Sequence, residues 1–591
     1  MKIKRESITV EIILYVFVFF AAAWLRLNHL GASPLSEAEA SHALAAASTT
    51  PHASPHWHNG ELVVPNNPVY HNLTALLFHL FGAEDAIARF VNALAGVSLV
   101  FTPILARKRL GRVNTLVLMI VFCISPILIA ISRTADGPSI AVLGIVLILM
   151  LIVGAESDDA IQKRMPWIAA ALGFTLATGA DAPYGLLMIC IAGLFRLKNI
   201  SALGKFVDTC KKFQIQRHAW IILAAWFAAV SGIGFTLGGF AGMAESIGGW
   251  FSGWFGPGQM PGITFILMLP IYDPLVFIFG LAGIFVAIRN PEGIGRGVVA
   301  WFVAALFVTL VYLGRKPSDI VWVALPMAIL AAQQLTLFVD RIATRKHWFE
   351  FFMLSCILIC IFAMDLMMLQ AYAGGSELGG VLKGVEPRFY PLIIIGSLIF
   401  AAVVITFVGM GWDLDVALDG AGAAAAIFLV LLTISSIWQL NFTKPSAREL
   451  WHPQATTTSM STLNTTIENI SQISTGREDA LSLQVNDADM HADIAWAMRD
   501  MARFLVEQEI LTAPELILTP EESRLTTFSG QYIGQSFVLG ERWAWSGILP
   551  PNFMHWWITR EAPISQENWI LMVRADLVPG ATDIMSAEDI E

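Results

Sequence analysis

Long apolar runs, separated by short polar segments, follow one another from the N-terminus to about residue 440. A run of about 20 apolar residues has the length of an α-helix that crosses the hydrocarbon core of a bilayer. The pattern therefore predicts thirteen transmembrane helices. They are expected at 8–27, 88–106, 113–132, 138–154, 166–179, 184–196, 219–239, 263–288, 297–314, 319–338, 348–370, 389–409 and 420–438.

Basic residues are distributed unevenly between the loops that join these runs. Lys and Arg gather in the N-terminal tip and in the loops at 107–112, 198–217 and 341–346, whereas the first outer loop, 28–72, has none. Basic loops stay in the cytoplasm. The asymmetry predicts a multi-pass protein of the cell membrane with a cytoplasmic N-terminus, although one predicted inner loop is acidic. An odd number of spans would place the C-terminus outside the cytoplasm.

The chain changes character after residue 440, so we divide it into three parts. Residues 1–440 form the predicted transmembrane domain, and residues 441–475 read as a Ser/Thr-rich linker. Residues 476–591 alternate strand-like and helix-like segments, which predicts a small extracytoplasmic α/β domain. Its expected elements are strands at 480–485, 514–520 and 568–577 and an amphipathic helix at 492–508.

Composition excludes several classes of function. Of the 591 residues only 14% are charged, against about a quarter in a soluble protein, and the mean hydropathy is +0.65. These values exclude a disordered chain and a conventional soluble enzyme. The net charge of −10 argues against a nucleic-acid partner. The five cysteines lie in or beside apolar runs, so neither a disulfide framework nor a zinc site is expected.

The first outer loop holds the strongest local signal of chemistry. Glu37 and Glu39 lie in a segment that looks helical from Pro34 to Ala47. Side chains two positions apart on a helix point about 200° from each other, so these carboxylates are not expected to form one dyad. One of them could act as a general base at a pocket beside the membrane. The alternative is that both stabilise the first helical turn.

Other motifs of catalysis are weak or absent. His52, His56 and His58 of the first loop could hold a transition metal, but their spacing matches no closed site, so an ordinary polar loop is favoured. The sequence has no Walker A motif, no GxGxxG that opens a soluble α/β unit and no HExxH. It also has no DxD-like pair in a cytoplasmic domain, which argues against a nucleotide-sugar donor.

A series of landmarks runs along most of the chain. They are Arg26, Leu30-Gly31, Pro34-Leu35, Glu39-Ala40, Pro68-Val69-Tyr70, Phe81-Gly82, Arg89, SRTADGPSI (132–140), TGADAPYG (178–185) and GRKPSDIVWVALPMAILAA (314–332). With them the chain resembles the GT-C fold membrane glycosyltransferases, in particular glycosyltransferase family 39, the protein O-mannosyltransferase and aminoarabinose transferase superfamily. The C-terminal pattern DIAWAMRD…GQSFVLGERWAW…MHWWITRE is similar to the flippase-activity-associated subgroup.

The resemblance implies an α-helical polytopic GT-C membrane protein that moves a sugar from a polyprenyl-phosphate donor to an extracytoplasmic acceptor. That acceptor could be a lipid, a glycan or a protein, and direct displacement would invert the anomeric carbon. The family has Asp-Glu where this chain has Ala38-Glu39, and the Asp is the residue usually taken as the base. Glu39 or Glu37 is therefore the expected catalytic residue. No cofactor is firmly implied, and a divalent metal stays open.

The phosphate of such a donor needs a cation at the outer face of the membrane. Arg89, Arg26, Arg315 and Lys316 are the candidates for binding it. Each has an alternative role. Arg89 could anchor a helix at the interface, Arg315 and Lys316 could snorkel, and Arg26 could pair with a glutamate of the first loop.

Three further residues are candidates for lining the site. Tyr70 and His71 belong to PVYHNL, which occupies the Pro-Leu-Tyr region of the family. Asp136 lies in a short outer loop, but Gly137 and Pro138 follow it, and that is also ordinary turn chemistry. All three are therefore expected only as possible lining residues of the site.

Two other functions stay open. The missing Asp favours a non-catalytic protein, either flippase-associated or handling glycolipids, that retains the fold. A secondary transporter would predict internal repeats, which the sequence does not display, and would leave the external C-terminal region without a role. The resemblance favours the transferase over both.

Overall fold

The computed structural model describes most of the chain. The described residues are 2–49, 67–196, 215–234, 238–258, 260–289, 295–343, 348–375, 384–486, 491–501, 503–506, 513–522 and 531–578. The three histidines considered as metal ligands from the sequence, His52, His56 and His58, lie outside these ranges.

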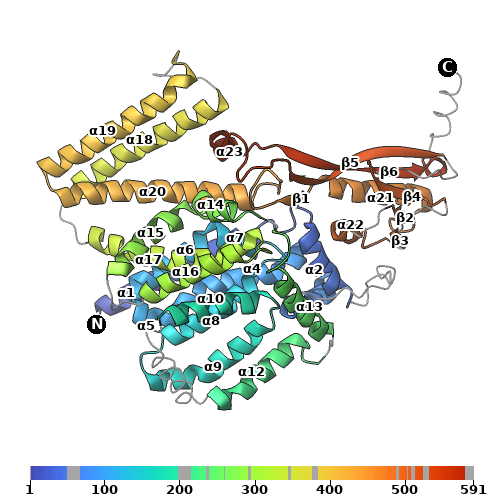
Figure 1. Ribbon diagram of the computed structural model, residues 1–591, viewed down its shortest axis with the longest axis horizontal. Coiled ribbons are helices and arrows are strands. Elements are labelled where there is room, and N and C mark those ends of the chain that lie inside the picture. Colours follow the sequence, from blue (N-terminus) through green and yellow to red (C-terminus); the bar gives the residue numbers. More distant parts are fainter. Residues whose placement is uncertain are drawn as a thin grey trace.

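Helices make up the first three quarters of the protein (Figure 1). Each of the thirteen predicted apolar runs overlaps one helix or one bent or continued series of helices. These are α1 (Lys2–Leu27), α4 (Asp85–Phe101) continued by η2 (Thr102–Ala106) and α5 (Arg107–Leu110), α6 (Arg112–Ile124) with α7 (Pro126–Ser132), α8 (Ser139–Val153), α9 (Asp158–Leu176), α10 (Asp181–Arg196), α12 (Ile215–Val230), α14 (Gly262–Tyr272) with α15 (Pro274–Arg289), α16 (Gly295–Val311), α17 (Val321–Ala343), α18 (Trp348–Gly374), α19 (Tyr390–Gly411) and α20 (Leu414–Asn441).

The number of membrane spans is smaller by a strict test of length and composition. Among the described residues, six helices are long and apolar enough to cross a membrane, or up to eight if each bent pair is one span. Four further apolar helices are shorter, with 10–17 residues. The structure therefore agrees with a membrane protein, but the predicted count of thirteen spans is not confirmed.

Two of the apolar runs are broken at a residue that precedes proline. α6 and α7 meet at 60° and α14 and α15 at 102°. Proline has no N–H to donate, so Pro126 leaves the carbonyl of Phe122 without its helical partner. Arg26 replaces that partner, because its Nη2 donates to the Phe122 oxygen at 2.9 Å. The two breaks touch each other, since the Ser125 hydroxyl donates to Asp273 Oδ2 at 2.5 Å.

Three short helices lie outside these runs: α2 (Glu37–Ala47), α3 (Pro68–Phe81) and α13 (Gly238–Ser252). α3 has 14 residues and α13 has 15, fewer than the about 20 that cross a bilayer. Ser36 and Glu39 begin α2 with a capping box, in which each side chain bonds the other residue's backbone N–H. Figure 1 shows α2 between the helical bundle and the sheet.

The C-terminal part is a mixed sheet of six strands in the order β1-β5-β6-β4-β2-β3. β2 is parallel to β3 and β4, whereas the β1–β5, β5–β6 and β4–β6 pairs are antiparallel. The strands are β1 (Gln454–Thr456), β2 (Ser482–Val485), β3 (Arg503–Val506), β4 (Leu516–Pro520), β5 (Tyr532–Trp543) and β6 (Ile564–Arg574). The helices are α21 (Ser459–Thr475), α22 (Ala492–Ala497) and α23 (Phe553–Thr559), and 3₁₀ turns occur at η3 (Pro317–Ile320), η5 (Pro387–Phe389) and η6 (Ala575–Leu577).

Two predictions for this part are wrong. The helix expected at 492–508 ends at Ala497, and Arg503–Val506 forms β3 instead, because it pairs with β2. The linker expected at 441–475 contains β1 and α21, which belong to the folded sheet domain. The predicted strands at 480–485, 514–520 and 568–577 overlap β2, β4 and β6.

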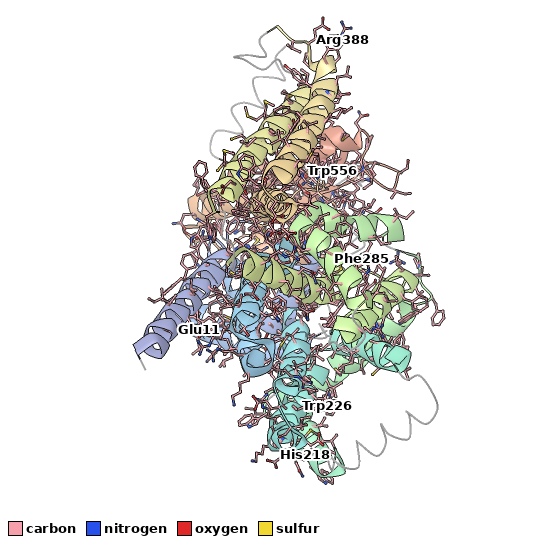
Figure 2. The ribbon with its side chains drawn as sticks, turned by 90° about the vertical axis from the view of Figure 1, so that its left-hand side faces the viewer. Glu11, His218, Trp226, Phe285, Arg388 and Trp556 are labelled. Atoms are coloured by element: carbon pink, nitrogen blue, oxygen red, sulfur yellow. The ribbon has the colours of Figure 1, made fainter. Side chains whose placement is uncertain are left out.

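Two buried tryptophans are among the residues that fix the sheet domain to the helical bundle. Trp556 of α23 is fully buried and its indole N–H donates to the Arg448 carbonyl at 2.7 Å, while α23 itself packs against α18 (Figure 2). On the other flank the Trp496 N–H donates to Asp85 at 2.6 Å, at the start of α4. Figure 1 shows the beginning of α1 at the end of the bundle far from the sheet.

Candidate functional site

A polar cavity of about 620 Å³ lies where the helical bundle faces the sheet domain. Its bundle side is formed by the start of α2, the α7–α8 loop and the segment around η3. Its sheet-domain side is formed by the segment before and in β1, the start of α22 and the facing ends of β5 and β6. The charged residues and histidines that line it are Glu37, Glu39, Asp136, Arg315, Lys316, His452, His491, Asp493, Glu541, Arg542 and Glu567.

Glu39 and Arg89 form a buried ion pair beneath the cavity. Arg89 Nε donates to Glu39 Oε1 at 2.7 Å and Nη2 to Oε2 at 2.8 Å, and both side chains are about 95% buried. The remaining guanidinium N–H groups donate to the carbonyls of Leu30, Ser33 and Pro34. Arg89 therefore has its donors occupied by protein groups, and its contacts favour the anchoring role over the binding of phosphate.

Glu39 is held as tightly as its partner. It accepts hydrogen bonds from the Ser36 N–H at 3.0 Å and from the Ala135 N–H at 3.0 Å, in addition to Arg89. Burial by itself would raise the pKa of Glu39, but the charge and hydrogen bonds of Arg89 and the two backbone N–H groups lower it below its ordinary value. A carboxylate with a lowered pKa and no vacant position is a weak general base.

Asp136 lies in the loop between α7 and α8, and contacts with neighbouring residues hold this loop in place. The Asn92 amide donates to the carbonyls of Thr134 and Ala135 at 2.7 and 2.9 Å. Glu39 holds the Ala135 N–H, and the residue after Asp136 must be glycine because a Cβ on Gly137 would lie 2.0 Å from the Ile131 carbonyl oxygen. Asp136 itself lines the cavity.

The environment of Asp136 suits proton abstraction. Burial, and then the neighbouring charge of Glu39, raise the pKa of the Asp136 carboxyl above its ordinary value. A raised pKa strengthens a carboxylate as a base at neutral pH. Glu37, by contrast, is an exposed residue at the edge of the same cavity. Between them, Ala38 occupies the position of the family's Asp, and it too lines the cavity.

The two cations of the η3 segment have different environments. Arg315 is 5% exposed and donates to the carbonyls of Thr309, Met260 and Leu310, so its contacts are structural. Lys316 is exposed and lines the cavity. Among the described residues Lys316 has no ion pair, which leaves its ammonium group able to receive an anion.

Three other predicted site residues lie outside the cavity lining. Arg26 is fully buried, and its Nη2 donates to the Phe122 carbonyl near the end of α6. Tyr70 is 1% exposed and its hydroxyl donates to the Ala88 carbonyl at 2.8 Å. His71 is 4% exposed, and burial lowers its pKa to about 4, so the ring is neutral at physiological pH. None of these three side chains is part of the cavity lining.

The sheet-domain side of the cavity consists of residues that were not among the predicted site residues, although Asp493, Glu541 and Arg542 belong to the C-terminal pattern of the resemblance. Trp451, His452, Asp493, Glu541 and Arg542 all line it. Burial lowers the pKa of His452 to about 4, so this ring is also neutral. The pattern alone does not indicate that these residues face the first loop, because they come from distant parts of the sequence.

An apolar groove of about 970 Å³ lies between α3, α8, α9 and α12. Leu73, Leu147, Trp167, Phe174 and Ala228 are among its walls. Its lining is almost entirely apolar, and the amide of its one polar residue, Asn72, is bonded to the Ala229 carbonyl at 2.8 Å. The groove can hold a hydrocarbon chain but offers nothing to a charged group.

Metal binding finds little support in the part of the chain that the structure describes. No group of three or more His, Cys, Asp or Glu side chains there could hold a metal ion. Glu39, Asp493, Glu541 and Glu567 of the lining are instead bonded to Arg, Ser, Thr or backbone N–H groups.

Comparison with known proteins identifies the fold. No protein-family model and no curated protein sequence matches the chain. The structure is similar to that of ArnT from Cupriavidus metallidurans bound to undecaprenyl phosphate, with a TM-score of 0.53, 12% identity, and coverage of 96% of this chain and 98% of that one. The apo form of the same protein gives a TM-score of 0.52 and 14% identity over 85% of this chain and 86% of that chain.

This likeness extends over nearly the whole length of both chains. It supports the GT-C fold that the landmarks of the first loop imply. At such low identity it establishes the fold alone, so membership of family 39 or of the flippase-associated subgroup stays a prediction.

Proposed function

We propose that this protein is a membrane glycosyltransferase that moves a sugar from a polyprenyl-phosphate donor to an acceptor bound in the polar cavity. The observation that carries the proposal is the cavity itself. In a chain with the fold of ArnT, it combines the carboxylate of Asp136 and the ammonium group of Lys316 on one wall. The ArnT structure contains undecaprenyl phosphate, and a lipid of that class suits the apolar groove beside α3.

The residues of the cavity suggest how the reaction would proceed. Asp136 takes the proton of an acceptor hydroxyl, and the resulting oxygen attacks the anomeric carbon of the donor. The new bond joins that oxygen to the anomeric carbon, while the bond from this carbon to the phosphate oxygen breaks. The electron pair leaves with the polyprenyl phosphate, whose charge Lys316 stabilises. A single displacement of this kind inverts the anomeric centre.

Glu39 takes a different part in this proposal from the one that the sequence suggested. Its ion pair with Arg89 and its bond to the Ala135 N–H place the loop that carries Asp136. We therefore treat Glu39 as a positioning residue and Asp136 as the base. Glu37, at the edge of the cavity, is the second candidate for the base.

The direct test is a transfer assay with the full chain in lipid nanodiscs. Labelled polyprenyl-phosphate sugars of several kinds would be offered together with a crude envelope extract as the acceptor. We expect labelled sugar to leave the lipid and enter the extract with one of the donors. Donor binding without any transfer across the whole panel would contradict the proposal.

Lys316→Met is expected to weaken the binding of undecaprenyl phosphate by about 10- to 100-fold. A hydrogen bond to a charged group contributes about 1.5–3 kcal/mol, and Arg315, the other cation of the bundle side of the lining, is already bonded to protein carbonyls. The measurement is a titration of the purified protein with this lipid. Lys163→Met, on the exposed surface of α9, is the matched control and should bind as the wild type does. Equal affinity of both variants for the lipid would show that Lys316 does not bind its phosphate.

Ala38→Asp is expected to restore transfer to an Asp136→Asn variant by about tenfold or more. Ala38 is exposed and lines the cavity, so a carboxylate placed there reaches the same space without a clash. The assay compares the double variant with Ala38→Asn in the same background. If the Asp and Asn variants are equally inactive, a carboxylate at position 38 does not face the reacting atoms.

A second function is favoured by one observation. Ala38 stands where the family's base would be, and a non-catalytic protein that only handles glycolipids would tolerate this. Such a protein would bind the donor lipid through the groove and Lys316 but would never release the sugar. The transfer assay separates the two functions directly.

A further inference from the structure

The sheet domain forms about half of the wall of the cavity, on the side facing Asp136 and Lys316. Its contribution comes from three places: the segment 451–456, the start of α22, and the ends of β5 and β6. These places are separate in sequence and are brought together by the fold, since β1 pairs with β5 and β5 with β6, and Thr456 of β1 bonds Asp493 of α22. A transferase needs a second substrate beside the donor, and this wall is the surface on which it would lie.

The polar side chains of this wall are fixed in advance. Asp493 accepts the Thr456 hydroxyl at 3.0 Å and the Ile494 N–H at 2.9 Å. Glu541 accepts the Ser446 hydroxyl at 2.7 Å through Oε2. A carboxylate has room for about four hydrogen bonds, so both groups retain accepting capacity toward the cavity. Side chains whose rotamers are locked by neighbours bind a ligand at low entropic cost.

An indole ring completes the wall. Trp451 lines the cavity, and its ring packs edge-on against Tyr272 at a centroid distance of 6.3 Å. Tyr272 in turn donates its hydroxyl to Glu449 at 2.7 Å, which fixes the support of the indole. A flat apolar ring beside oriented hydrogen-bond acceptors suits a ligand that has one apolar face and a rim of hydroxyl groups.

The charges of the cavity exclude an anionic ligand from this wall. Asp493, Glu541 and Glu567 face it with one cation, Arg542, which is paired with Glu567. The opposite wall adds Glu37 and Asp136. Like charges in a partly desolvated cavity repel, so a carboxylate or phosphate on the acceptor would be disfavoured here. Lys316, on the opposite wall, is left for the donor.

We infer that the sheet domain binds the acceptor and that the acceptor is a neutral carbohydrate. The carboxylates of Asp493 and Glu541 accept hydrogen bonds from its hydroxyl groups, and Trp451 packs against the apolar face of its ring. This inference rests on the proposed function, because only a transferase gives the bound carbohydrate the role of acceptor. The binding itself does not depend on transfer.

Saturation-transfer-difference NMR on the protein in nanodiscs tests the binding without requiring activity. The probes are methyl glycosides of glucose, galactose, mannose and N-acetylglucosamine, the methyl glycoside of glucuronic acid, and a short Ser/Thr peptide. We expect at least one neutral glycoside to give a signal, and the glucuronide and the peptide to give none. The signal should fall by about tenfold in Asp493→Asn, the loss expected for one hydrogen bond to a charged group.

Two variants make the test specific. Asp576→Asn changes an exposed carboxylate of the same domain that does not line the cavity, and it should bind as the wild type does. Trp451→Ala should also lose the signal, and a thermal unfolding curve shows whether either variant has lost its fold. If Asp493→Asn and Asp576→Asn lose the signal equally, or if no neutral glycoside binds, the inference fails.

The inference and the proposed function fail in different ways. Glycosides that bind through Asp493 in a protein that never transfers sugar would support the inference and contradict the function. Transfer to the peptide or to an anionic lipid, without binding of any neutral glycoside, would support the function and contradict the inference.

Discussion

Asp136→Asn is expected to lower the turnover number of sugar transfer by about 10²- to 10⁴-fold, the range that a positioned general base contributes. The substitution keeps the shape of the side chain and removes only its ability to take a proton. The hydrogen bonds that fix the loop come from Asn92, Glu39 and the backbone, so the loop should keep its conformation. Binding of the donor lipid should be unchanged, because Asp136 does not bind the phosphate in the proposed reaction.

The pH profile separates a base from a residue that merely shapes the cavity. Burial and the charge of Glu39 raise the pKa of Asp136, and a base acts in its deprotonated form. Transfer by the wild type should therefore fall as the pH drops through that raised pKa, above the range of an ordinary aspartate. The residual activity of Asp136→Asn should lack this acid limb.

Asp159→Asn is the matched control for Asp136→Asn, because this aspartate lies on the exposed surface of α9 and pairs with Lys163. It should have the turnover and the pH profile of the wild type. Full activity of a folded Asp136→Asn protein would contradict the role of Asp136 and favour Glu37, which lines the same cavity, as the base.

The helices could be predicted from the sequence because their cause is local. A run of apolar residues forms a helix in a membrane whatever the rest of the chain does, since every backbone group must bond within its own segment. The break between α14 and α15 was harder to predict, because Asp273 and Pro274 lie inside an apolar run that reads as continuous. β3 was missed for the opposite reason: its pairing with β2 depends on residues outside the segment.

Several residues of the candidate site could be predicted from the sequence, but not which of them contact each other. Glu39 and Arg89 were both singled out, yet for separate chemical roles. Only the fold shows that they bond to each other across 50 residues of chain. The sequence pattern includes Asp493 but does not show that it faces Asp136, since the two line one cavity from distant parts of the chain. Contacts of this kind depend on docking between elements, which a local pattern does not encode.

Glu39→Gln is expected to destabilise the protein by about 3–5 kcal/mol, the usual cost of removing one partner of a buried ion pair. Arg89 would keep its charge in a site where it is about 95% buried, and the neutral amide could not balance it. The measurement is the free energy of unfolding, or the thermal midpoint, of the protein in lipid. Replacing both partners, in Glu39→Gln with Arg89→Met, should cost less than the sum of the single changes, because no uncompensated charge remains.

The sign of the pH dependence gives a second test of the same pair. Arg89 and the backbone N–H groups lower the pKa of Glu39 in the folded protein. A lowered pKa contributes stability that is present above the unfolded pKa of about 4.3 and is lost as the pH falls through the folded value. Glu39→Gln should remove this acid-side loss of stability. If Glu39 were the base, by contrast, Glu39→Gln would stay folded at neutral pH and lose only transfer, whereas Asp136→Asn would keep it.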